Sequence, residues 1–263
     1  MTSHPTLLDT VEAGIARITL NRPEQRNALD IPTLKALIDL LDRFEADPAV
    51  RVLLLTGSGR SFCAGADLAE WADAERRGIL ETYGWTETAH VLMNRLHGFA
   101  KPTIAAINGT AVGAGMDLTL CCDFRLAAQS ARFKAGYTSM AYSPDAGASW
   151  HLPRLIGTEQ AKSLLFLDEL WGAERALATG LVSEVCADEQ LAASATELAS
   201  RLAAGPTFAF AQTKVLIRDG AQRSLAEQLQ AEQAAGLLCG RSRDGIEALQ
   251  AAVEKRVPHF IGQ

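Results

Sequence analysis

The spacing of apolar residues in the first sixty positions predicts a strand, a helix and a second strand. Gly14 to Leu20 alternates between apolar and polar residues, which is typical of a strand. Val50 to Thr56 is almost continuously apolar, which favours a buried strand. Between them, Asp30 is a suitable N-cap and Pro32 stands in the first turn of a segment with helical spacing. This order predicts a right-handed crossover unit.

The same alternation recurs in the middle of the chain. A helix is predicted over residues 86–99, a strand over 103–107, a helix over 114–122 and a strand over 124–127. Residues 70–84 are charged and irregular, so we expect a mobile segment there. The repeated exchange of strand and helix predicts an α/β fold.

The last third of the chain is mostly helical in pattern. The segments that show this pattern are 158–169, 173–179, 189–204, 208–219 and 225–257. Gly205-Pro206 interrupts it and predicts a hinge between a core of residues 1–204 and a C-terminal helical subdomain of residues 205–263.

Composition and charge narrow the class of protein. The 263 residues are 48% hydrophobic and 21% charged, which is ordinary for a soluble globular protein. A net charge of −6, without a run of lysine or arginine, disfavours a nucleic-acid partner. The most apolar stretch, residues 104–122, is interrupted by three glycines, Asn108 and Asp117, so we expect no membrane span. Residues 1–11 show no signal-peptide pattern, and we expect a cytoplasmic protein.

The five cysteines fit a reducing compartment. Their number is odd and no C-x-x-C occurs, so we expect free thiols. We interpret Cys63 as a small apolar packing residue, since no histidine lies near it in the sequence. The sequence shows no fingerprint for a nicotinamide, flavin or nucleoside-triphosphate site, and we expect no metal site.

Two stretches of small residues each follow a predicted strand and lead into a predicted helix. They are Phe62-Cys-Ala-Gly-Ala-Asp67 and Asn108-Gly-Thr-Ala-Val-Gly-Ala-Gly115. Small residues at such turns let the backbone approach a ligand and expose N–H groups at a helix N-terminus. If the turns face one point, the N–H groups of Ala64 and Ala114 would donate to a single oxygen. We therefore predict an oxyanion hole, in which each donor is worth about 3–4 kcal/mol of barrier.

These two stretches resemble the paired oxyanion-hole signature of the enoyl-CoA hydratase/isomerase (crotonase) superfamily. The resemblance runs from about Gly14 to Phe260 and includes Asn21-Arg-Pro near the start of the chain. It implies an α/β fold with a crotonase-like repeated ββα spiral core. It also implies that the C-terminal helices make the contacts of a homotrimer, often paired into a hexamer.

The resemblance implies an acyl-CoA thioester substrate, with coenzyme A as part of the substrate and no separate cofactor. The positions that match coenzyme A contacts in relatives are Arg26, Ala28, Ala64, Gly65, Ala66, Asp67 and Leu68. Arg22, close to the same loop, is a further candidate for binding an anionic group.

Two positions argue against the usual hydratase chemistry. Typical hydratases of the superfamily carry two glutamates that hold and activate water, and this chain has Asp117 and Tyr137 at the matching positions. Aspartate is shorter than glutamate, and tyrosine is a poor base near neutral pH because its reference pKa is about 10. An atypical hydratase stays an alternative.

Asp145, in Tyr142-Ser-Pro-Asp-Ala-Gly147, offers a different base. In two branches of the superfamily this position is a catalytic aspartate: the Δ3,Δ2-enoyl-CoA isomerases similar to those of phenylacetate degradation, and the 4-chlorobenzoyl-CoA dehalogenases. In isomerisation one carboxylate removes a C2 proton, the oxyanion hole holds the dienolate, and the proton returns at C4. We predict an enoyl-CoA isomerase that uses Asp145, with help from Asp117.

Other interpretations stay open. A dehalogenase or thioester hydrolase would use Asp145 with His90, which falls at the histidine position of the dehalogenases, while Tyr137 replaces their supporting tryptophan. His90 is alternatively a plain helix residue, and Asp117 a structural one. A non-enzymatic acyl-CoA-binding or RNA-binding relative is the alternative from another class. Trp71 and Trp85, with Tyr83, indicate an acyl site that accepts rings.

Overall fold

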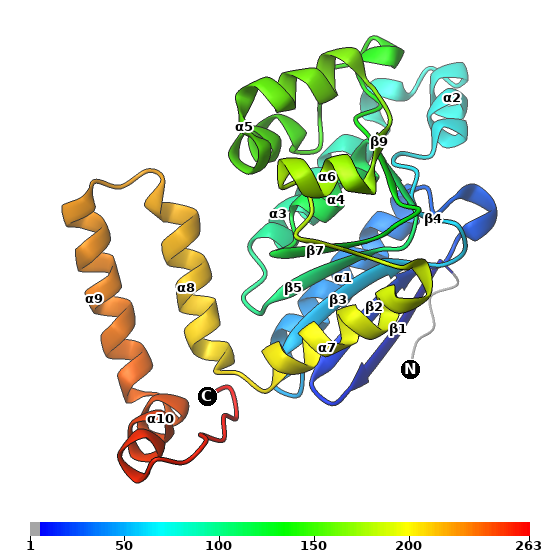
Figure 1. Cartoon of the computed structure of the whole chain (residues 1–263). Helices are drawn as coiled ribbons and strands as arrows, with labels where there is room; N and C mark the ends of the chain where they lie inside the picture. Colours follow the sequence, from blue (N-terminus) through cyan, green and yellow to red (C-terminus); the bar gives the residue numbers. More distant parts are fainter. Residues whose placement is uncertain (1–5) are drawn as a thin grey trace.

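The computed structural model describes residues 6–263, and a six-stranded sheet forms its centre (Figure 1). The strands of this sheet, in spatial order, are β1 (Leu7–Glu12), β2 (Ile15–Leu20), β3 (Val52–Gly57), β5 (Thr103–Ile107), β7 (Phe124–Ala128) and β10 (Glu184–Cys186). All neighbouring pairs are parallel except β1 with β2. The predicted α/β class is confirmed.

A second, four-stranded sheet is built from very short strands. In spatial order these are β4 (Ser61–Cys63), β6 (Thr110–Val112), β8 (Arg132–Lys134) and β9 (Trp171–Gly172). Three times along the chain, a strand of the large sheet is followed by a strand of this small sheet and then by a helix. This is the ββα repeat that the family resemblance implied.

Helices cover both faces of the large sheet (Figure 1). α1 (Ile31–Ala46) and α3 (Trp85–His97) pack together on one face, and α7 (Leu191–Ala203) crosses the other. The remaining helices of the core are α2 (Leu68–Arg76), α4 (Ala114–Leu120), α5 (Ala148–Leu167) and α6 (Ala173–Thr179). One-turn 3₁₀ helices are η1 (Pro23–Gln25), η2 (Leu80–Thr82), η3 (Thr138–Met140) and η4 (Asp188–Gln190). As expected, Asp30 caps α1, its carboxylate accepting the Thr33 N–H at 2.8 Å.

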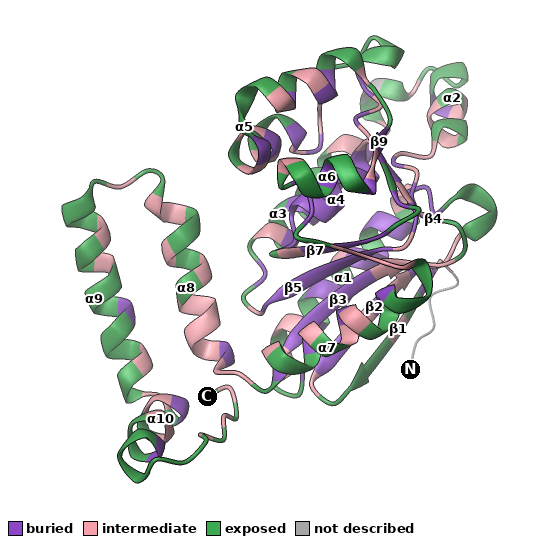
Figure 2. Ribbon diagram, viewed as in Figure 1, coloured by how far each residue is buried: buried purple, intermediate pink, exposed green. Residues whose placement is uncertain are grey.

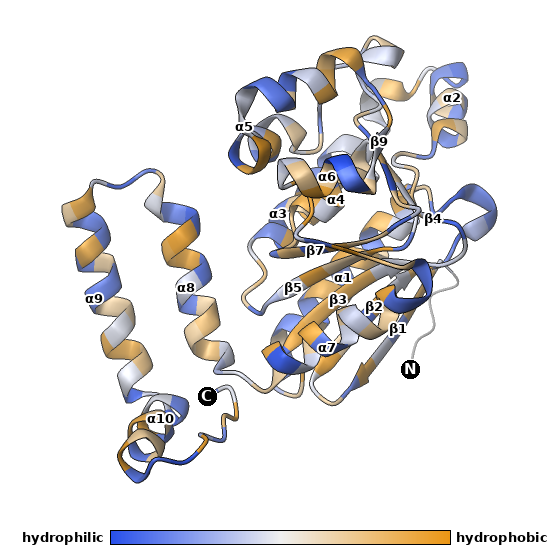
Figure 3. Ribbon diagram, in the orientation of Figure 1, coloured by the Kyte–Doolittle hydropathy of each residue, from blue (hydrophilic) through white to orange (hydrophobic). Residues whose placement is uncertain are grey.

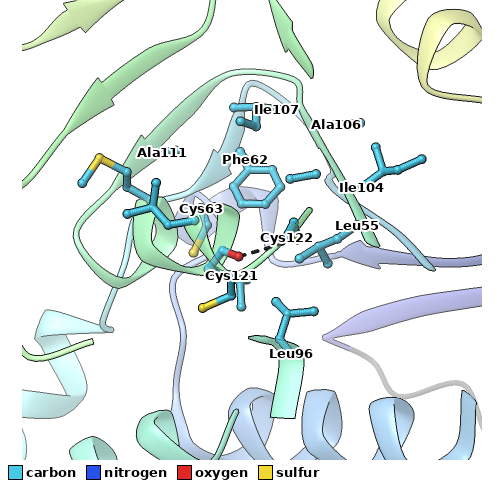
Figure 4. Close-up of a cluster of buried hydrophobic side chains, with 14 of the residues drawn as sticks. Leu55, Phe62, Cys63, Leu96, Ile104, Ala106, Ile107, Ala111, Cys121 and Cys122 are labelled. Carbon is cyan, nitrogen blue, oxygen red and sulfur yellow. Dashed lines mark hydrogen bonds between the residues drawn. The ribbon is translucent and has the colours of Figure 1, made fainter. Parts of the chain in front are cut away.

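The core lies between the sheets and the helices, and its residues are purple in Figure 2. Phe62 and Cys63, on β4, are fully buried there beside Leu55, Ile104 and Ile107 (Figure 4). Burial raises the pKa of the Cys63 thiol to about 12, so this thiol stays protonated. The structure agrees with Cys63 as a packing residue.

The start of α4 rests directly on the backbone of the first small-residue turn. A Cβ added at Gly115 would lie 2.4 Å from the Cys63 carbonyl oxygen, far closer than van der Waals contact allows. Only glycine therefore lets the two turns meet at this distance.

The segment predicted to be irregular, residues 70–84, instead contains α2 and η2. The Asp67 carboxylate accepts the N–H groups of Ala69 at 3.2 Å and Glu70 at 3.4 Å, and so caps α2. The expectation was wrong because α2 buries only Ala74, so its sequence shows little of the apolar periodicity that predicts a helix. The one continuous helix expected over 225–257 is also wrong. Ser242 ends α9 and caps the next helix by accepting the Gly245 N–H at 2.9 Å.

The C-terminal helices α8 (Thr207–Gly220), α9 (Leu225–Arg241) and α10 (Arg243–Glu254) stand apart from the sheets (Figure 1). Gly205-Pro206, the predicted hinge, lies between α7 and α8. Hydrophobic and hydrophilic residues are interspersed along α8, α9 and α10 (Figure 3). Side chains more than half exposed are Ile217, Leu225, Leu229, Leu237, Leu238, Ile246, Leu249 and Val253. Single exposed apolar residues scattered over a protein surface are normal, but so many on three consecutive helices exceed that level.

No helix within residues 6–263 combines the length and apolar content needed to cross a membrane. Residues 1–5, part of the segment searched for a signal peptide, lie outside the described residues.

The contact at Gly115 leads to a prediction about stability. Gly115→Ala should lower the free energy of unfolding by about 2–3 kcal/mol, because the added Cβ forces the two turns apart. Gly172→Ala is the control on β9, where a Cβ would meet no atom within 4 Å, and it should lose far less. Urea unfolding of the three proteins measures this. Equal midpoints for Gly115→Ala and wild type would contradict the close contact.

Candidate active site

A cavity of about 110 Å³ opens between the two small-residue turns. Its floor is the backbone of both turns, and its walls come from α2, α3 and the loop between β8 and α5. The residues that line it are Ala64, Gly65, Ala66, Leu68, Trp71, Trp85, Val112, Gly113, Ala114, Gly136, Tyr137, Met140, Tyr142 and Asp145.

The Ala64 N–H is not available to a ligand, which corrects the sequence prediction. It donates to the Arg26 carbonyl at 3.0 Å and holds the neighbouring loop in place. The Ala66 N–H, two residues on, has no acceptor among the described residues, and Ala66 also lines the cavity. The motif alone could not distinguish the two alanines, because the neighbouring Arg26 loop that binds one of them is distant in sequence.

Ala114 is where the sequence predicted it. It is the first residue of α4, so its N–H has no partner within the helix, and none among the other described residues. A Cβ on Gly65 would lie 3.5 Å from the Ala114 nitrogen, which places the two turns side by side. Ala66 and Ala114 therefore each offer the cavity a backbone N–H that has no acceptor among residues 6–263.

The loop expected to contact coenzyme A runs beside the first turn. Leu29 N–H donates to the Gly65 carbonyl at 2.8 Å, and Asp67 N–H donates to the Leu29 carbonyl at 3.2 Å. Arg26 is exposed at the edge of this loop, whereas Ala28 is buried. Leu68, 51% exposed, stands at the rim of the cavity. The predicted contact residues thus form one continuous edge.

Arg22 acts as a brace within the protein. Its guanidinium pairs with Asp67 at 3.0 Å and Asp30 at 3.3 Å, and it donates to the Ala28 carbonyl at 2.6 Å. Two carboxylates already balance its charge, so Arg22 is a poor candidate for binding an anionic ligand. The Asp67 side chain is likewise engaged, by Arg22 and by the start of α2.

Asp145 is the only carboxylate among the residues that line the cavity. It is partly buried in the loop before α5, and burial raises the pKa of its carboxyl above the usual 3.8, while a charged His90 lowers it. The His90 Nε2 lies 2.6 Å from the Asp145 backbone carbonyl. His90 itself is exposed and lines a separate hollow with His97 and His151, not this cavity.

Asp117 and Tyr137 form a pair behind the cavity wall. The Tyr137 hydroxyl donates to Asp117 Oδ2 at 2.5 Å, and Oδ1 has no partner among the described residues. Asp117 has no exposed surface and does not line the cavity, whereas Tyr137 does. Burial raises the pKa of Asp117 to about 7, with the hydrogen bond from Tyr137 lowering it and Asp145 raising it. Burial and Asp117 also raise the pKa of Tyr137, so the phenol stays protonated.

Aromatic rings form one wall of the cavity. Trp71 contacts Trp85 and Tyr142 edge to face, with ring centroids 5.5 Å and 6.0 Å apart. The Trp85 Nε1–H donates to the Leu29 carbonyl at 2.7 Å, which fixes that ring. The sequence indicated Trp71 and Trp85 but missed Tyr142. Tyr83 packs against the core and does not line the cavity.

A family model described as enoyl-CoA hydratase/isomerase matches residues 10–263. The chain belongs to the enoyl-CoA hydratase/isomerase family. It is 38% identical to the 1,2-epoxyphenylacetyl-CoA isomerase of Escherichia coli strain K12 over 259 residues, 98% of each chain.

Solved structures match this fold closely. PA4980 of Pseudomonas aeruginosa is 72% identical, with a TM-score of 0.85 over 89% of this chain and 99% of its own. An enoyl-CoA hydratase from Bacillus anthracis is 35% identical, with a TM-score of 0.90 over 98% of this chain and 100% of its own. The crotonase-like fold expected from the sequence is thereby confirmed.

The position of Ala114 permits a direct test of the oxyanion donor. Proline is tolerated at the first residue of a helix and has no N–H, so Ala114→Pro removes the donor while leaving α4 in place. We expect kcat for an enoyl-CoA thioester to fall about 10²–10³-fold. Ala114→Gly keeps the N–H and should retain most activity. Circular dichroism checks the fold, and a folded proline variant with full turnover would exclude the Ala114 N–H as a donor.

Proposed function

We propose that this protein is an enoyl-CoA isomerase that moves a double bond from the 3 to the 2 position of an acyl-CoA thioester. The observation that carries the proposal is that Asp145 shares one small cavity with two free backbone donors, Ala66 and Ala114. A thioester oxygen bound to those donors becomes able to carry negative charge at its neighbouring carbon.

The proposed mechanism needs one base. Asp145 removes a proton from C2, the two N–H groups stabilise the dienolate oxygen, and the same carboxyl returns the proton to C4. The raised pKa of Asp145 suits this role, because a stronger base accepts the proton more readily and later gives it back. The apolar aromatic wall keeps water away from the dienolate.

Hydration of a 2-enoyl thioester is supported less well. It needs two groups that hold and activate a water, and Asp117 is enclosed behind Tyr137 with no exposed surface. Dehalogenation or thioester hydrolysis would need His90 near the reacting carbon, whereas His90 lies on the far side of the Asp145 backbone.

The second candidate function is an isomerase that acts on a ring-bearing acyl group. The cavity wall of Trp71, Trp85 and Tyr142 suits the edges and faces of an aromatic or cyclic group. The similarity to a relative named 1,2-epoxyphenylacetyl-CoA isomerase supports the same direction. Both candidates use Asp145 and the same pair of N–H donors.

We also propose that coenzyme A lies along the edge formed by Arg26, Ala28 and the segment 64–68, with the exposed Arg26 near its phosphates. Coenzyme A enters as part of the substrate, and no other cofactor is needed for the proton transfers. All five cysteines are free, which supports a location in the reducing cytoplasm.

The decisive experiment replaces the base. Asp145→Asn should lower conversion of 3-hexenoyl-CoA to its 2-isomer about 10²–10⁴-fold, measured by absorbance and mass spectrometry. In the wild type, kcat/KM should rise with pH through the Asp145 pKa, since only the carboxylate removes a proton. Asp42→Asn, a surface aspartate paired with Arg95, is the matched control and should behave as wild type.

Parallel assays separate the alternatives. Hydration of crotonyl-CoA that survives Asp145→Asn would move the chemistry to Asp117 and Tyr137. Chloride release from 4-chlorobenzoyl-CoA would favour the dehalogenase and give His90 a catalytic role. Binding of thioesters without turnover of any of them would favour an acyl-CoA-binding protein.

We propose that the exposed apolar side chains of α8–α10 are covered by further copies of the chain in a homotrimer, alone or paired into a hexamer. Light scattering should give three or six times the mass of one chain. The double variant Leu237→Asp, Leu238→Asp should dissociate it, because both side chains are more than half exposed in the single chain. Leu8→Asp, similarly exposed on β1, is the control. A monomeric wild type would contradict the proposal.

A further inference from the structure

Two carboxyl groups and one phenol follow one another from the protein interior to the cavity. Asp117 is innermost and receives the Tyr137 hydroxyl at 2.5 Å. Tyr137 is nearly buried but reaches the cavity, and Asp145 lines it. Tyr137 and Asp145 line the same cavity of about 110 Å³. Burial raises the pKa of Asp145, and hydrogen bonding with the Tyr137 hydroxyl opposes that shift. Tyr137 therefore lies between the two carboxyls and is in reach of both.

We propose that Asp117 is a positioning residue that sets the basicity of Asp145 through the Tyr137 hydroxyl, without touching the acyl group. This inference rests on the proposed function, in which Asp145 is the base. It gives a role to a fully buried carboxyl whose second oxygen has no partner among the described residues. Such a group is costly to bury.

Asp117 and Asp145 are coupled because the Tyr137 hydroxyl has one hydrogen and can donate it to only one of the two carboxyls at a time. When Asp117 is protonated, its O–H donates to the Tyr137 oxygen, and the Tyr137 O–H donates to the Asp145 carboxylate. When Asp117 loses its proton to solvent, the Tyr137 O–H turns to Asp117 instead. Asp145 then has lost a donor and gained a negative neighbour. Both changes raise the pKa of Asp145 and make it a stronger base.

The other titratable groups near Asp117 and Asp145 do not disturb the coupling between these two carboxyls. The other titratable groups that face the two carboxyls are His90 on α3, which acts on Asp145, and Cys121 at the end of α4, which lies near Asp117. Burial raises the pKa of the Cys121 thiol, so it stays neutral. Because burial also raises the pKa of Asp117 to about 7, the two states interchange near neutral pH.

A carboxyl titration by NMR tests the coupling without relying on turnover. In protein labelled with ¹³C at the aspartate carboxyls, the Asp145 signal is identified by its loss in Asp145→Asn. We expect this signal to show its own inflection and a second one near pH 7. The second inflection should vanish in Asp117→Asn and become much smaller in Tyr137→Phe. A single inflection in the wild type would overturn the proposal, whether or not either variant folds.

The pH dependence of kcat on 3-hexenoyl-CoA gives the functional test. The kcat of the wild type should rise about two- to fivefold as the pH passes through the titration of Asp117. The kcat of Asp117→Asn should not change with pH once Asp145 is ionised. Asp42→Asn should keep the wild-type profile. Identical profiles for wild type, Asp117→Asn and Tyr137→Phe would reject the coupling. Absence of isomerase turnover together with a second inflection by NMR would reject the proposed function and leave the coupling in place.

Discussion

A packing constraint on which the site depends lies where α4 begins on the Cys63 carbonyl, with no room for a Cβ at Gly115. This contact brings together two turns that are about fifty residues apart in sequence and belong to successive ββα repeats. Because each turn ends a short strand and starts a helix, their approach leaves the Ala66 and Ala114 N–H groups unpaired at one cavity. The small second sheet, in which β4 pairs with β6, fixes their relative register.

The proton affinities of the two carboxyls at the site depend on how deeply each lies below this cavity. Asp117, on the helix that the contact anchors, has no exposed surface, while Asp145, on the loop before α5, lines the cavity. Two carboxyls at different depths have different proton affinities, and the phenol of Tyr137, which donates to Asp117, stands between them. In the proposed mechanism, Asp145 reacts with the acyl group and Asp117 tunes its basicity.

The sequence identified the long elements and the two turns well, because a buried strand such as Thr103–Ile107 and a helix start at Ala114 have strong local patterns. It could not identify strands of two or three residues, which are too short to show a period. It assigned the donor to Ala64, because the partner of that N–H, the Arg26 carbonyl, becomes adjacent only in the folded chain. The role of Arg22 as a brace was missed for the same reason: its carboxylate partner Asp67 lies 45 residues further along the chain.

The relation between Asp117 and Tyr137 explains why family membership alone does not define the reaction. Relatives with the same fold carry the names of hydratases and of an isomerase. A hydratase needs its acid and base to reach one water, so both must face the cavity. Here Asp117 is enclosed behind Tyr137, and Asp145 is the one carboxyl among the residues that line the cavity. In the proposed mechanism, this carboxyl and two backbone donors move a proton between two carbons of the same acyl chain, a step that needs no activated water.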